Sequence, residues 1–184
     1  MTNSLKALCI AVPALLAGVP AWPQTDWQVA SAAVSFKIKN AGIGTQGGFS
    51  GFGGKILFDA DALETSRLEA SVDAKTIDTG IGLRDNHLRK EEYFHADKYP
   101  KITMKSVRIV RAGGNAFTGT FQLTIKAVTR KVDIPFTFVQ SGNAARLKGD
   151  FIIDRRAYGV GKNHFTLSDN ATISIDLRLA KPPA

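Results

Sequence analysis

The stretch of sequence that decides the fold is residues 67–75, which read RLEASVDAK. Its apolar side chains, Leu68, Ala70, Val72 and Ala74, alternate with charged and hydroxyl side chains. A period of two places successive side chains on opposite faces of a β-strand. The pattern therefore predicts a strand with one buried face and one exposed face.

The same alternation recurs on both sides of this stretch. It predicts eight strands, whose inward rows fall within residues 34–38, 54–58, 68–74, 102–109, 117–125, 132–138, 147–153 and 173–179. In the fourth strand the apolar parity changes after Ser106, where Val107 and Ile109 take over from Ile102 and Met104. Such a change of parity predicts a β-bulge.

The connections between the strands indicate how they are arranged. Most contain turn-forming residues, as in Gly113-Gly114-Asn115. Residues 83–94 instead carry dense charge and good helix formers, with Asp78 or Thr79 upstream as a cap, and predict a short helix between the third and fourth strands. Alternating strands with short hairpins form a sandwich or a barrel, and only closure removes the strand edges. The expected fold is all-β, an eight-stranded antiparallel up-and-down barrel with one short helix.

Length and composition fit one domain with a packed core. The chain has 184 residues, of which 44% are hydrophobic and 22% charged, and its formal net charge is +8. The single cysteine, Cys9, excludes a disulfide scaffold. A positive charge favours anionic lipid headgroups, acidic ligands or nucleic acid as partners.

The first residues carry the pattern of a secretory signal. Lys6 precedes an apolar run over residues 7–19, and Val19-Pro20-Ala21 offers small residues at a cleavage site. We expect a signal peptide over residues 1–21 and one mature domain over residues 22–184. Removal of this signal peptide would remove Cys9, and a secreted domain without cysteine suits a periplasm. Secretion also makes nucleic acid the least favoured partner.

The predicted inward rows mix large and small side chains and contain no charged residue. They combine Phe36, Phe58, Phe121, Phe136, Phe138 and Phe151 with Gly54, Ala70, Ala74, Gly119 and Gly149. Large and small residues can interdigitate into a solid core. Alternatively, the small residues leave space for a long apolar tunnel. Composition does not separate these two interpretations.

Two patterns that suggest bound groups have simpler explanations. Residues 42–47 match G-x-G-x-x-G, but further glycines follow and the segment runs into a strand, whereas a dinucleotide site needs a helix there. We interpret it as a turn and a bent glycine-rich strand. His87, His95 and His164 lack the close spacing of metal ligands. No metal or cofactor is expected.

No catalytic constellation is apparent. There is no G-x-S-x-G elbow, and removal of the signal would remove the only cysteine. Asp150 and Asp154 share one parity, but beside Arg155 and Arg156 they are more simply solvated ion pairs. The sequence therefore predicts no enzyme.

The most distinctive polar cluster is RDNHLR at residues 84–89. Asp85 and Arg89 are spaced i, i+4, which is typical of an ion pair on a helix surface. The alternative is that Arg84, His87 or Arg89 reaches an acidic headgroup at a barrel mouth, because arginine suits bidentate phosphate contacts.

Taken in order, several segments resemble the signatures of the YceI-like family. They are SVD through TIDT at residues 71–79, RDNHLR at 84–89, Phe94 with KYPKIT at 98–103, GTFQLTI with VTR at 119–130, and DRRAYGVG at 154–161. The resemblance implies a secreted bacterial protein with a lipocalin-like eight-stranded barrel. It also implies a long isoprenoid chain, of polyprenyl or quinone type, or another amphiphile, bound in an apolar tunnel.

On this resemblance the expected function is a periplasmic protein that sequesters or carries such a lipid. The expected lipid-binding residues are Phe36, Ile38, Phe58, Leu68, Val72, Met104, Phe121, Leu123, Phe136, Phe138, Phe151 and Ile153, and the candidate headgroup residues are Arg84, His87 and Arg89. A membrane surface, contacted transiently, and a second copy of the chain in a homodimer are further candidate partners. The alternatives are a stress-related periplasmic protein or an enzyme acting on a bound isoprenoid lipid.

Overall fold

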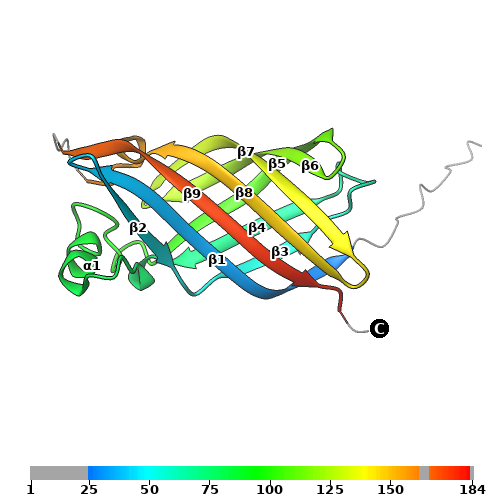
Figure 1. Ribbon diagram of the computed structural model, residues 1–184, viewed down its shortest axis with the longest axis horizontal. Coiled ribbons are helices and arrows are strands. Elements are labelled where there is room, and N and C mark those ends of the chain that lie inside the picture. The colour runs from blue at the N-terminus through cyan, green and yellow to red at the C-terminus, as the bar shows by residue number, and fades with distance from the viewer. Residues whose placement is uncertain (1–24, 162–165, 183–184) are drawn as a thin grey trace, which may run out of the picture.

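The computed structural model describes residues 25–161 and 166–182. Within these ranges nine strands form one antiparallel sheet, and the pairing of its first strand with its last closes it into a barrel (Figure 1). The strands are β1 (Asp26–Asn40), β2 (Ile43–Phe49), β3 (Gly53–Leu57), β4 (Arg67–Asp73), β5 (Lys101–Gly113), β6 (Ala116–Ile125), β7 (Val128–Ser141), β8 (Ala144–Asp154) and β9 (Leu167–Ala180). The expected signal segment, residues 1–21, and His164 lie outside the described residues.

The nine strands occupy eight places in the barrel wall. Both β2 and β3 pair with β1, β2 along residues 34–40 and β3 at Asp26 and Trp27, while β9 covers the other edge of β1. The predicted eight-stranded antiparallel barrel is thus confirmed. The glycine-rich segment is a turn at Gly42, with φ of 79°, followed by the strand β2.

Alternation predicted the remaining strands because each has one face on the core. In β8, odd-numbered residues are buried and even-numbered residues exposed throughout. The predicted bulge in β5 is present as a register shift between Ser106 and Arg108. Ile109 is buried as expected, but Val107 is 50% exposed, because it is the residue that the bulge turns outward.

The expected helix lies between β4 and β5 but is shorter than predicted. It is α1 (Gly82–Leu88), and its N-cap is Ile81 rather than Asp78 or Thr79. Tyr93 and Phe94, which were predicted to extend it, instead turn toward the barrel, where Tyr93 is 8% exposed. Tertiary packing overrides helix propensity here. None of the helices in the described parts of the chain is long and apolar enough to cross a membrane.

Aromatic rings fill the end of the barrel that lies opposite α1. The Phe58 ring packs 5.1 Å from Phe117, 5.9 Å from Phe136 and 4.4 Å from Phe138, measured between ring centroids. Trp27 completes this aromatic cluster, 5.4 Å from Phe138, and its indole N–H donates to the carbonyl of Phe58. At this end the barrel interior is a solid core.

Candidate functional site

The other end of the barrel is hollow. A cavity of about 190 Å³ lies beside α1, because Arg84 and Leu88 of this helix line it. Its apolar lining includes Val34, Phe36, Ile38, Phe49, Phe52, Val72, Ile102, Met104, Leu123, Ile125, Phe151, Ile153, Leu167, Ile173 and Ile175. An apolar cavity of about 150 Å³ already accepts benzene. This cavity can therefore hold the first part of an apolar chain.

The structure divides the twelve predicted lipid-binding residues between the two ends of the barrel. The cavity is lined by Phe36, Ile38, Val72, Met104, Leu123, Phe151 and Ile153. The others, Phe58, Leu68, Phe121, Phe136 and Phe138, are buried in the core without lining the cavity. The interpretations of a solid core and of an apolar tunnel each describe one part of the interior.

Three aromatic rings form one wall of the cavity. Phe36 lies 5.7 Å from Phe49, and Phe49 lies 5.5 Å from Phe94, measured between centroids. Gly47 makes this possible, because a Cβ there would lie 2.5 Å from the Phe36 ring. Sequence reasoning missed Phe49 and Phe94, because one lies in a glycine-rich strand without alternation and the other in a segment predicted to be helical.

The RDNHLR cluster ties α1 to residues 75–79, beside the cavity. Asp85 is 6% exposed, and its carboxylate accepts hydrogen bonds from the backbone N–H and the hydroxyl of Thr79. The Arg89 guanidinium donates to the carbonyls of Lys75 and Ile77. The predicted surface ion pair between Asp85 and Arg89 is therefore wrong, because each side chain is engaged with this neighbouring segment. The helix and residues 75–79 form a single cap beside the cavity.

The three candidate headgroup residues occupy different positions. Arg84 lines the cavity, and its Nε and Nη2 donate to the hydroxyl and the carbonyl of Thr79. Its Nη1 has no acceptor in the described parts of the chain. His87 is exposed and packs against Tyr93, and neither it nor Arg89 lines the cavity. Of these three residues, therefore, only Arg84 lines the cavity.

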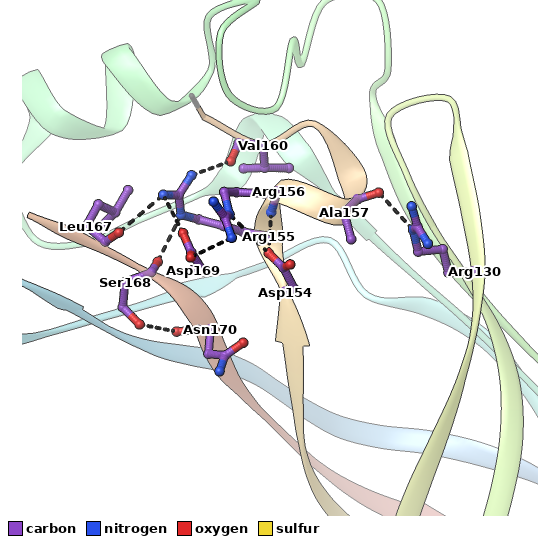
Figure 2. A network of polar contacts seen from close by, with 10 residues as sticks. All are labelled: Arg130, Asp154, Arg155, Arg156, Ala157, Val160, Leu167, Ser168, Asp169 and Asn170. Carbon is purple, nitrogen blue, oxygen red and sulfur yellow. Dashed lines mark hydrogen bonds and ion pairs between the residues drawn. The ribbon is translucent and has the colours of Figure 1, made fainter. Parts of the chain in front are cut away.

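A buried arginine, Arg155, also lines the cavity, and Figure 2 shows its polar contacts. Arg155 is 4% exposed, and its guanidinium donates to the carbonyls of Val160, Ser168 and Leu167. It also lies 3.6 Å from a carboxylate oxygen of Asp169. The prediction that Arg155 belongs to a solvated surface pair is wrong, because it lies in η2 (Arg155–Tyr158) and its side chain enters the wall between β8 and β9.

Near this arginine lies a buried hydroxyl. Tyr158 is 2% exposed, and its hydroxyl has no hydrogen-bond partner in the described parts of the chain. Burial raises the pKa of this phenol above its ordinary value, so it stays neutral at physiological pH. Tyr158 does not line the cavity.

Within residues 25–161 and 166–182, no group of three or more metal-ligating side chains comes together. The cavity is bordered by few polar side chains, chiefly Ser35, Asn40, Thr45, Ser71, Thr79, Arg84, Thr103 and Arg155. An arrangement of this kind can bind an apolar chain and orient a polar end group.

Fold and cavity together define a lipocalin-like β-barrel that encloses an apolar cavity at one end. The chain belongs to the YceI-like family, whose domain model matches residues 26–179. A UPF0312 protein of Vibrio parahaemolyticus is 32% identical over 146 residues, which are 78% of this chain and 77% of that protein. The resemblance inferred from the sequence motifs is thereby confirmed.

Solved structures show the same fold. The crystal structure of Burkholderia cenocepacia BcnA matches with a TM-score of 0.78 and 28% identity, covering 83% of this chain and 99% of that chain. A polyisoprenoid binding domain from Saccharophagus degradans, implicated in plant cell wall breakdown, matches with a TM-score of 0.68 and 13% identity. The match covers 86% of this chain and 99% of that domain, and at this identity it shows the fold alone.

Proposed function

We propose that this protein binds the apolar chain of an amphiphile inside its barrel, and that the ligand is a long-chain isoprenoid of polyprenyl or quinone type. The observation that carries the proposal is the apolar cavity of about 190 Å³, which the surrounding side chains leave unfilled. The name of the Saccharophagus degradans domain supports the isoprenoid class. The role is sequestration or transport rather than catalysis.

The cavity accounts for such binding in simple terms. Each methylene-sized group that leaves water contributes about 0.8 kcal/mol. Affinity should therefore rise with chain length until the cavity is full, and the lining selects for width more than for chemical detail. The signal pattern of residues 1–21 supports a periplasmic location, and transient contact with a membrane surface would supply the chain.

Filling the cavity from within should abolish binding. Ala70 is half-buried and lines the cavity from β4, so Ala70→Phe places a ring where the chain would lie. We expect its affinity for a fluorescent polyene or prenyl chain to fall at least tenfold, measured by equilibrium titration. The matched change Ala127→Phe, at an exposed turn outside the cavity, should leave affinity unchanged.

Thermal unfolding checks that Ala70→Phe and Ala127→Phe are both folded. Thr45→Phe fills the cavity from β2 and gives a second test should Ala70→Phe not fold. Native mass spectrometry of the purified protein should reveal a co-purifying apolar ligand. A protein that takes up no prenyl or acyl chain contradicts the proposal.

Arg84 should recognise the polar end of the ligand through its Nη1. A hydrogen bond between charged groups contributes about 1.5–3 kcal/mol. We therefore expect Arg84→Gln to weaken binding of a fatty acid about tenfold, and binding of the alcohol with the same chain much less. Lys39→Gln, which removes an exposed charge from β1 at the same end of the barrel, should not change the ratio of the two affinities. An unchanged ratio in Arg84→Gln contradicts this role.

A further inference from the structure

The barrel wall is open between β1 and the strands β2 and β3. Pairing stops after Val34 and Phe49 and resumes at Trp27 and Ile56. These pairs are seven positions apart on both sides, so the two ladders share one register. Residues 28–33 therefore face residues 50–55 without pairing to them, and we call this gap the wall opening.

Ser50, on the side of the wall opening away from β1, is bound to Asp73 and Thr76 instead of to β1. The Ser50 N–H donates to the Thr76 hydroxyl, and the Ser50 carbonyl accepts from the same hydroxyl and from the Asp73 N–H. Gly51 has a φ of 67°, which interrupts extended backbone, and a Cβ there would lie 3.1 Å from the Cβ of Asp73. The connection between β2 and β3 is thus bound to the end of β4, at Asp73, and to Thr76 beyond it, rather than to β1.

The wall opening adjoins the cavity at Phe52. A surface groove of mixed polarity follows it. Its apolar lining includes Trp27, Val29 and Ala32, its polar lining includes Asp26, Gln28, Ser31 and Lys55, and Phe52 lines both this groove and the cavity. Ala32 has the same parity as the cavity residues Val34 and Phe36, yet it is exposed. Phe52 is therefore the residue that the cavity and the groove have in common.

A long ligand needs such an exit. The cavity holds only the first part of a long chain, and the aromatic cluster around Phe58 blocks the path along the barrel. We propose that the wall opening is a second binding site, at which the distal part of a long prenyl or acyl chain passes Phe52 and lies in the groove. This inference rests on the proposed function, because it concerns the same ligand.

Covalent capture tests the proposal on a folded protein. In a Cys9→Ser background, Ala32→Cys places one thiol in the groove at an exposed position. A hexadecanoic acid with a maleimide at its distal end should modify this thiol at least tenfold faster than a six-carbon analogue, and unlabelled hexadecanoic acid should suppress the difference. Ile152→Cys, which is 64% exposed on the outside of β8, should react equally fast with both probes.

The outcomes separate this proposal from the proposed function. If hexadecanoic acid binds but Ala32→Cys reacts no faster with the long probe than with the six-carbon probe, the wall opening is not the exit, although the cavity binds chains. If no chain binds at all, both proposals fail. A dimer linked through Ala32→Cys, with no chain-length effect, would assign the groove to a second copy and overturn the inference.

A kinetic measurement probes Phe52 itself. In stopped-flow uptake of a long fluorescent chain, Phe52→Ala should raise the association rate severalfold, because the side chain that the groove and the cavity share becomes smaller. Because Phe52 also lines the cavity, uptake of a short chain serves as the reference, and the ratio of the long-chain rate to the short-chain rate should rise. Equal acceleration of both chains would place the effect in the cavity and contradict a role at the wall opening.

Discussion

Replacing Arg155 with methionine is expected to lower the free energy of unfolding by about 3–5 kcal/mol. Methionine keeps most of the apolar stem but removes the donors that the carbonyls of Val160, Ser168 and Leu167 accept from. A buried acceptor left without a donor costs about 1–3 kcal/mol. Asp169 keeps an ion pair with Arg156 at 2.7 Å, so the loss should come from the carbonyls. Urea denaturation measures it.

The neighbouring arginine supplies a matched control. Arg156 makes ion pairs with Asp154 and Asp169, but its side chain is 42% exposed. Water and salt screen pairs of this kind, so Arg156→Met should cost no more than about 1 kcal/mol. Equal effects of the two substitutions would show that the Arg155 contacts do not hold the wall together.

Loss of Arg155 should also be felt at the cavity. Val160 and Leu167, whose carbonyls it holds, both line the cavity, as does Arg155 itself. A variant that remains folded should therefore bind apolar chains more weakly. The stability of this wall and the shape of the cavity thus depend on the same buried guanidinium.

Most strands of the barrel wall could be predicted from the sequence, because a strand with one buried face has alternating apolar and polar residues. β4 and β8 alternate clearly, and even the bulge after Ser106 is visible as a change of parity. In contrast, β2 has no such alternation. Its glycines leave few side chains to alternate. The sequence predicts a turn and a bent glycine-rich strand at residues 42–47, but no pattern predicts that this strand pairs with β1.

Buried polar groups were the least predictable. Arg155 stands beside an aspartate and another arginine, a local pattern typical of the surface. Its partners Leu167 and Ser168 lie twelve and thirteen residues further along the chain, and they are backbone carbonyls, which no residue type reveals. Asp85 and Arg89 were misread for the same reason, because their partners are largely backbone groups of residues 75–79.

The site could be predicted by composition but not by position. Phenylalanines of the inward rows serve two purposes, since Phe36 and Phe151 line the cavity while Phe58 and Phe138 fill the far end. The difference depends on which strand ends meet around each ring. Alternation assigns a side chain to the inside of a barrel but does not say how far along the barrel the inside is filled.

Phe58→Ala should be the most destabilising change in the aromatic cluster, at about 3–5 kcal/mol. The ring is 1% exposed and packs against three other rings, so its removal leaves a void that rigid neighbours cannot close. Because Phe58 does not line the cavity, the affinity for an apolar chain should stay within about twofold at temperatures where the variant is folded.

Phe151→Ala also removes a phenylalanine ring, but at the cavity instead of in the aromatic cluster. Comparison with Phe58→Ala therefore separates an effect on ligand binding from an effect on stability. Phe151 is 7% exposed and lines the cavity, so its loss should widen the space and favour thicker, branched chains over linear ones. Titration of both variants with a prenyl alcohol and a linear alcohol measures the contrast. If Phe58→Ala changed this preference as much as Phe151→Ala, the chain would reach the aromatic cluster, and the ligand would run along the barrel rather than leave it beside Phe52.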